Sequence, residues 1–169
     1  MHTQRTAYQR TVATLLWLSI TFAWLVSIFS VIQEMCLATA CRDTVAFSFF
    51  GINLGWLGIA YFSMLLLLLW QRTRIVRLDW ALAALVFAGV GAEFRLLWIQ
   101  KYIIGGWCPL CVSICCALFC AAVLLVIEKK QGGNAEVADK INLPIWLVAM
   151  TVLAALGLAI AILGVKTLE

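Results

Sequence analysis

Residues 108–127 read CPLCVSICCALFCAAVLLVI, a block of twenty residues without a charged side chain. At about 1.5 Å per residue, a helix of this length crosses the roughly 30 Å hydrocarbon core of a bilayer. Similar apolar blocks lie at 11–32, 51–70, 80–99 and 144–165. Backbone groups in lipid must be hydrogen-bonded within their own element, so each block is expected to be a helix. The sequence therefore predicts an all-α integral membrane protein with five transmembrane helices.

The composition agrees with one transmembrane domain over residues 1–169. The chain is 65% hydrophobic and 12% charged, which a soluble domain of this size could not bury. The net charge of +4 comes from basic residues in loops beside the spans, where they act as topology signals. Lipid is therefore the expected surrounding, and nucleic acid is not expected as a partner. Ala38-Thr39-Ala40 resembles a signal cleavage site, but the 22 residues of 11–32 exceed a typical signal core, so a retained helix is expected.

Lys and Arg in the loops predict the orientation, because basic residues gather on the cytoplasmic side. With the N-terminus in the cytoplasm, eight basic residues lie inside: Arg5, Arg10, Arg72, Arg74, Arg77, Lys129, Lys130 and Lys140. Four lie at or near the outside: Arg42, Arg95, Lys101 and Lys166. The predicted location is a bacterial inner membrane, crossed several times, with the N-terminus in the cytoplasm.

Four of the seven cysteines then lie on the outer face. Cys36 and Cys41 are in the first outer loop, 33–50, and Cys108 and Cys111 form a C-x-x-C at the start of the fourth span. Disulfides persist on this side of a bacterial membrane. Thiol–disulfide exchange proceeds by thiolate attack on a disulfide, so two pairs can relay two electrons from a soluble dithiol into the bilayer. The relay is expected to use all four cysteines as catalytic residues.

The C-x-x-C lies where a helix begins after Gly105-Gly106. Unpaired N–H groups of a first helical turn favour a thiolate, and Pro109 suits that turn because its missing N–H costs nothing there. Other interpretations stay open. Either pair is also compatible with a structural disulfide, and a zinc site of four thiolates has no other feature in its favour. The only histidine, His2, lies in the N-terminal tail, so no metal is predicted.

With these cysteines the chain resembles a bacterial member of the vitamin K epoxide reductase family, over roughly residues 10–127. The resemblance rests on Cys36-x4-Cys41, on Phe50-Gly51-Ile52 with Leu57-Gly58-Ile59-Ala60-Tyr61, and on the stretch from Gln100 to Cys111 with its Gly-Gly-Trp-Cys-Pro-Leu-Cys end. It implies a four-helix bundle around a quinone, with a short interfacial helix in the outer loop above it. The fifth span, 144–165, would be a peripheral helix. With it, the chain resembles those family members in which a thioredoxin-like domain follows on the outer side of the membrane.

The resemblance also implies roles for single residues. Cys36 and Cys41 would be the shuttle pair that meets a thioredoxin-like periplasmic protein or fused domain. Cys108 would exchange with that pair, and Cys111 would reduce the quinone, either ubiquinone or menaquinone.

Polar contacts to the quinone depart from the family pattern. Ser48 resembles a serine after the loop pair, one residue late. Asn53 is the substitute for an asparagine that is out of register, and Cys115 replaces a hydroxyl-bearing residue one turn after the C-x-x-C. These three residues are the expected additional quinone contacts.

The expected function is that of a quinone-dependent thiol–disulfide oxidoreductase that supports disulfide bond formation. The disulfide-forming DsbB proteins do the same job but have their C-x-x-C in the first outer loop, whereas here it follows the third span. A non-enzymatic membrane transporter or assembly factor with structural disulfides is the alternative, and vitamin K epoxide reduction would use the same cysteines. Glu93 and Arg95 near the outer end of the third span are expected to be paired or to extend to the interface, and a functional role for them is the alternative.

Overall fold

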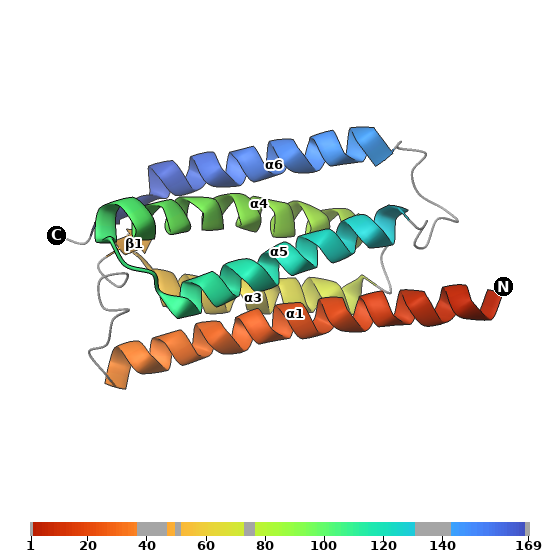
Figure 1. The fold of residues 1–169 in the computed structure, drawn as a ribbon, viewed down its shortest axis with the longest axis horizontal. Coiled ribbons are helices and arrows are strands. Elements are labelled where there is room, and N and C mark those ends of the chain that lie inside the picture. The colour runs from red at the N-terminus through yellow and green to blue at the C-terminus, as the bar shows by residue number, and fades with distance from the viewer. Residues whose placement is uncertain (1, 37–46, 50–51, 73–76, 131–142, 168–169) are drawn as a thin grey trace.

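Five helices that are long and apolar enough to cross a membrane make up the computed structural model (Figure 1). They are α1 (His2–Cys36), α3 (Leu54–Gln71), α4 (Arg77–Ile99), α5 (Pro109–Lys130) and α6 (Leu143–Gly164). The structure describes residues 2–36, 47–49, 52–72, 77–130 and 143–167. The chain is thus a multi-pass membrane protein, and the five predicted spans are confirmed.

The ends of the helices differ from the predicted bounds, and three of these differences lie at the end of the bundle that holds the cysteines. The first helix continues past residue 32 to Cys36, so the outer loop begins later than expected. The second span does not begin at 51, because Ile52–Asn53 forms a strand, β2, and Asn53 caps α3 by accepting the N–H of Gly55 on Oδ1 at 2.8 Å. The fifth span ends at Gly164. Hydropathy alone does not register these ends, since it carries no information on the hydrogen bonds of caps and strands.

A small antiparallel sheet lies at one end of the bundle, and the hydropathy pattern did not predict it. Its order is β2–β1–β3, with β1 at Phe47–Phe49 and β3 at Val165–Thr167. Ser48 is opposite Asn53 on one side and Lys166 on the other. The sheet therefore joins the segment after the first cysteine pair to the end of α6. The short interfacial helix implied by the resemblance would fall on residues outside those described.

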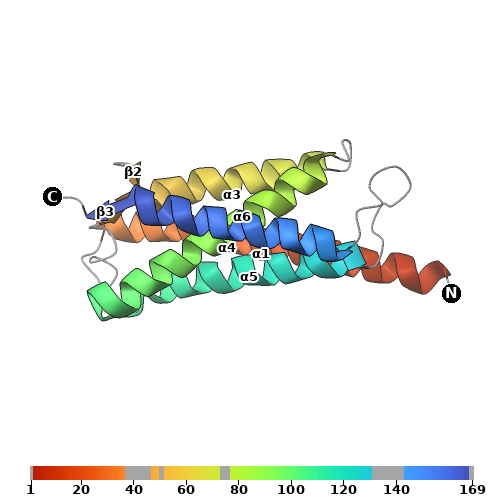
Figure 2. The same cartoon turned by 90° about the horizontal axis from the view of Figure 1, so that it is seen from above.

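The helices pack as two neighbouring sets. The first helix lies against α3 and α5, while α4 lies against α6 and α5 (Figures 1 and 2). The crossing of α4 and α6 depends on glycine: a Cβ at Gly91 would lie 1.9 Å from the carbonyl oxygen of Ala154, and one at Gly157 would lie 2.0 Å from that of Ala88. Small residues allow such close approach between membrane helices. Helix α6 packs mainly against α4, at one side of the bundle.

The opposite end of the bundle carries an ion pair between α3 and α5. The Arg72 guanidinium donates two hydrogen bonds to the carboxylate of Glu128, at 2.7 and 3.0 Å. Nearby, the Lys129 ammonium lies 5.7 Å from the ring centre of Trp80. This polar end is the one that the loop charges assign to the cytoplasm.

Candidate functional site

The C-x-x-C lies at the start of α5, as the sequence predicts. Pro109 is the first residue of the helix, and the carbonyl oxygen of Cys108 accepts the N–H of Val112 at 3.1 Å. Cys108 is buried, with 3% of its surface exposed, and Cys111 is half-buried one turn further into the helix. The Cys111 thiol is within hydrogen-bonding reach of the Cys108 side chain. The two sulfurs are therefore close enough to act as one redox pair.

A π-helical turn, η1 (Gln100–Ile104), leads from α4 to the cysteines. Such turns are rare and often occur at functional sites. The turn ends at Gly105, whose φ of 71° is left-handed and favours glycine. The main-chain oxygen of Gln100 accepts the N–H of Gly106 at 3.2 Å. This hydrogen bond closes the turn, so that the chain has returned to the bundle at Cys108.

The side chain of Gln100 holds the start of the cysteine motif in place. It is 2% exposed, and its Oε1 accepts the N–H of Cys108 at 3.3 Å. The same side chain is within hydrogen-bonding reach of the Cys111 thiol. One buried amide thus hydrogen-bonds the main chain of Cys108 and lies near the Cys111 thiol.

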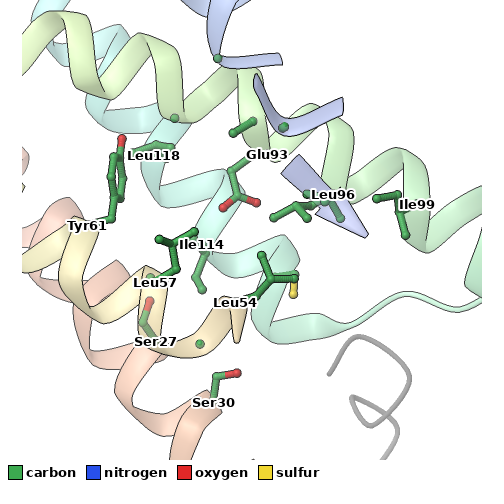
Figure 3. Close-up of a pocket in the computed structure, with 18 of the residues that line it drawn as sticks. Ser27, Ser30, Leu54, Leu57, Tyr61, Glu93, Leu96, Ile99, Ile114 and Leu118 are labelled. Carbon is green, nitrogen blue, oxygen red and sulfur yellow. The ribbon is translucent and has the colours of Figure 1, made fainter. Parts of the chain in front are cut away.

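Beneath the motif lies a cavity of about 370 Å³ between the helices (Figure 3). Pockets for small molecules and cofactors are typically about 300–1,000 Å³ and mostly apolar, with a few polar groups. Cys111 lies on its wall, together with residues from all five helices. Most of the lining is aliphatic or glycine, including Leu54, Leu57, Leu96, Ile99, Ile114 and Leu118. The cavity is suited to a largely apolar molecule.

The polar groups of the cavity come from four helices, from β2 and from η1. They are Ser27, Ser30, Asn53, Tyr61, Glu93, Gln100 and Cys111. Two of the hydroxyl donors are already engaged: Ser27 donates to the carbonyl oxygen of Ala23 at 3.0 Å, and Tyr61 to that of Leu85 at 2.8 Å. Gly89 leaves room for the Tyr61 hydroxyl, because a Cβ there would lie 2.1 Å from Oη.

The remaining predicted site residues fall at the same end of the molecule or outside the description. Cys36 is the last residue of α1, whose end lies at the same end of the bundle as the start of α5 (Figure 1). Cys41 lies outside the described residues. Ser48 is in β1, opposite Asn53. Asn53 lines the cavity, but its Oδ1 also caps α3.

The other cysteines of α5 do not line the cavity. Cys115, predicted as a further quinone contact, is half-buried one turn below Cys111, and the cavity wall at that level is formed by Ile114 and Leu118. Cys116 and Cys120 are exposed on the helix surface. The helical rotation of about 100° per residue separates these thiols from the cavity.

Three residues of the site are absent from the sequence prediction or have a different role in it. Gln100 enters that prediction only as part of the family stretch, and Tyr61 only as part of the glycine-containing segment. Glu93 was expected to be paired or to reach the interface, yet it lines the cavity and its buried Oε2 has no hydrogen-bond partner among the described residues. Arg95 instead lies over the ring of Trp98, 4.6 Å from its centre. The sequence feature that could have indicated this role of Glu93 is its position within an apolar span, two residues before Arg95.

Comparison with protein-family models, with curated proteins and with solved structures finds no match to this chain.

Proposed function

We propose that this protein is a quinone-coupled thiol–disulfide oxidoreductase of the kind found in the vitamin K epoxide reductase family. The observation that carries the proposal is the position of the C-x-x-C. Cys111 lies on the wall of an apolar cavity within the membrane, and Cys108 lies beside it at the end of the bundle where α1 ends with Cys36. A thiol pair between a polar end and an apolar cavity suits the transfer of electrons from a soluble dithiol to a lipid-soluble acceptor.

The electron transfer balances through two exchanges. A reduced thioredoxin-like carrier gives its two electrons to the Cys36–Cys41 disulfide, and the carrier's own disulfide forms. The reduced loop pair then reduces a Cys108–Cys111 disulfide by thiolate attack and release of the second thiol. Finally Cys108 and Cys111 close their disulfide again and pass two electrons and two protons to a quinone, the second substrate, which leaves as quinol.

The cavity fits a quinone head group in size and chemistry. Its aliphatic and glycine-rich lining suits a flat ring, and its few polar side chains can hydrogen-bond the ring oxygens. Asn53, Glu93 and Gln100 would be the residues that hold the quinone oxygens. Ser48, whose side chain is outside the described part of the structure, stays a predicted contact, and so does Cys115, which the cavity lining does not include.

The proposal places the cysteine end of the bundle on the periplasmic face of a bacterial inner membrane. The opposite end holds Arg72, Lys129 and Lys130, as the excess of positive charge on cytoplasmic loops requires. Thioredoxin-like periplasmic proteins, or a fused domain of that kind, are the proposed partners.

Substitution of Cys111 by Ala tests the proposal. In purified protein supplied with a short-chain quinone and a reduced thioredoxin-like carrier, the wild type is expected to bleach the quinone absorbance. The Cys111→Ala variant should reduce quinone no faster than the uncatalysed mixture, because the thiol beside the cavity is gone. Its loop pair should still form a mixed disulfide with the carrier.

Cys120→Ala is the matched control, since it removes an exposed thiol from the same helix and leaves the cavity lining intact. It should reduce quinone at the wild-type rate. Equal rates for Cys111→Ala and wild type would contradict the proposal and favour a non-enzymatic protein with structural disulfides.

A further inference from the structure

Glu93 is a membrane-embedded carboxyl group with an unsatisfied oxygen. It lies in the second half of α4, and Figure 3 shows its carboxyl group pointing from that helix into the space between α3 and α5. Its Oε2 is buried and has no hydrogen-bond partner among the residues that the structure describes. Because a buried polar atom is costly unless it is hydrogen-bonded, such an orphan indicates a ligand position.

Among the side chains that the structure describes, the groups around Glu93 do not supply a counter-ion. Tyr61 of α3 and Cys111 and Cys115 of α5 are close enough to interact electrostatically with it, and all three are acids rather than bases. Of the described side chains, those from α1 that line the cavity are serines, and those from α6 are glycine and aliphatic residues. Arg95 of the same helix lies over Trp98, and both salt bridges found among the described residues belong to Arg72.

An isolated carboxylate in an apolar, membrane-embedded cavity is far more costly than a neutral carboxylic acid. The acid form carries an O–H, so Glu93 can donate a hydrogen bond into the cavity. The hydroxyl groups of Ser27 and Tyr61 cannot easily do so, since each already donates to a main-chain oxygen. Glu93 in its acid form is therefore the strongest hydrogen-bond donor on the cavity wall that is not already bonded to a main-chain oxygen.

We infer that Glu93 is the acid of this site: it hydrogen-bonds a carbonyl oxygen of the quinone and gives that oxygen a proton during reduction. This inference rests on the proposed function and adds a catalytic residue to it. The Cys108–Cys111 dithiol releases two electrons and two protons when its disulfide forms. Glu93 gives its proton to one quinone oxygen and takes back one of the two released protons, and the second released proton goes to the other oxygen.

The test uses the full-length protein with reduced Cys108 and Cys111, mixed with a short-chain quinone in a single turnover. Glu93→Gln keeps the shape and a hydrogen-bond donor but cannot transfer a proton. Its quinone affinity, followed by tryptophan quenching, should stay within about threefold of wild type. Its single-turnover rate should fall about 10²-fold or more, as expected for loss of a general acid.

The pH profile separates proton transfer from a structural role. In the wild type the rate should rise with pH as thiolate forms and fall again at higher pH, because a deprotonated Glu93 can no longer donate. Glu93→Gln should lose the descending part and keep the ascending part, which belongs to the cysteines. In infrared difference spectra, the carboxylic acid band that shifts on quinone binding should be absent from this variant.

Glu128→Gln is the matched control, because Glu128 lies in the ion pair at the other end of the bundle. It should keep the wild-type rate and pH profile. If wild-type protein reduces quinone and Glu93→Gln does so at the same rate and pH profile, the role of Glu93 is refuted while the proposed function stands. If wild-type protein itself does not reduce quinone, the proposed function fails and takes the role of Glu93 with it.

Discussion

At the scale of single residues, the cysteine motif depends on one buried amide. Gln100 accepts the N–H of Cys108 through its side chain and the N–H of Gly106 through its main chain, and its amide also reaches Cys111. Leu at this position would have a similar volume but no acceptor. The N–H of Cys108 would then be buried without a partner.

We therefore expect Gln100→Leu to destabilise the protein by about 1–3 kcal/mol, the usual cost of a buried unsatisfied donor. The thermal midpoint of unfolding in detergent, followed by circular dichroism, should fall by several degrees. Alkylation of Cys111 should become faster, because its turn is held less firmly. Gln71→Leu changes an exposed glutamine at the end of α3 and should leave both measurements unchanged. Equal effects of the two substitutions would contradict the role given to Gln100.

The residues of the site were only partly accessible from the sequence. The C-x-x-C and its position at a helix start follow from local chemistry, since Pro and a preceding Gly-Gly mark such a turn. The functions of Gln100 and Tyr61 do not, because they depend on which atoms of other elements lie opposite them. Glu93 was visible as a charge in a span, but only the three-dimensional arrangement shows that Arg95 turns away from it toward Trp98.

At the scale of elements, η1 directs the chain from α4 into the cysteine turn. Its end requires the left-handed φ of 71° at Gly105, while Gly106 has no such requirement. A Cβ added at either glycine would meet no atom within 4 Å, so crowding plays no part at these two positions. The two glycines thus form a natural pair for comparing backbone conformation alone.

Gly105→Ala should lower the free energy of unfolding by about 1–2 kcal/mol, the cost of a left-handed conformation for a residue with a Cβ. Gly106→Ala should be close to neutral. Chemical unfolding of both variants in mixed micelles measures the difference. If Gly105→Ala left the free energy of unfolding unchanged, the end of η1 would not depend on a left-handed glycine.

The helices could be predicted from the sequence, whereas the strands could not. Five helices were predictable because blocks of about twenty apolar residues are long enough to span a bilayer, and this length signal does not depend on tertiary contacts. The strands β1, β2 and β3 contain only two or three residues each, and they exist because Ser48 finds partners on both sides. No local signal identifies pairing between residues 47–49 and 165–167.

At the scale of the whole molecule, the bundle has two chemically different ends. One holds the C-x-x-C, the sheet and the end of α1; the other holds the Arg72–Glu128 ion pair and the first residues of α4 and α6 (Figures 1 and 2). Exposed aromatic side chains mark the cysteine end, among them Trp98, Tyr102 and Trp107. Aromatic residues are enriched at membrane interfaces, so both ends are suited to contact water.

The orientation of these ends can be measured with single cysteines in a variant that lacks the native ones. Tyr102→Cys, at a position 64% exposed, should react with a membrane-impermeant maleimide in intact spheroplasts. Gln71→Cys, at the opposite end of the bundle, should react only after the membrane is permeabilised. The reverse pattern would place the cysteine pair in the cytoplasm and would contradict the proposed relay.

The sheet has one more consequence, for protein engineering. Because β3 pairs with β1, the polypeptide leaves α6 at the end of the bundle that holds the C-x-x-C. A carrier domain joined to this strand by a short flexible tether would experience an effective concentration in the millimolar range. In such a chimera, encounter between carrier and membrane domain would no longer depend on diffusion, and turnover would be independent of dilution.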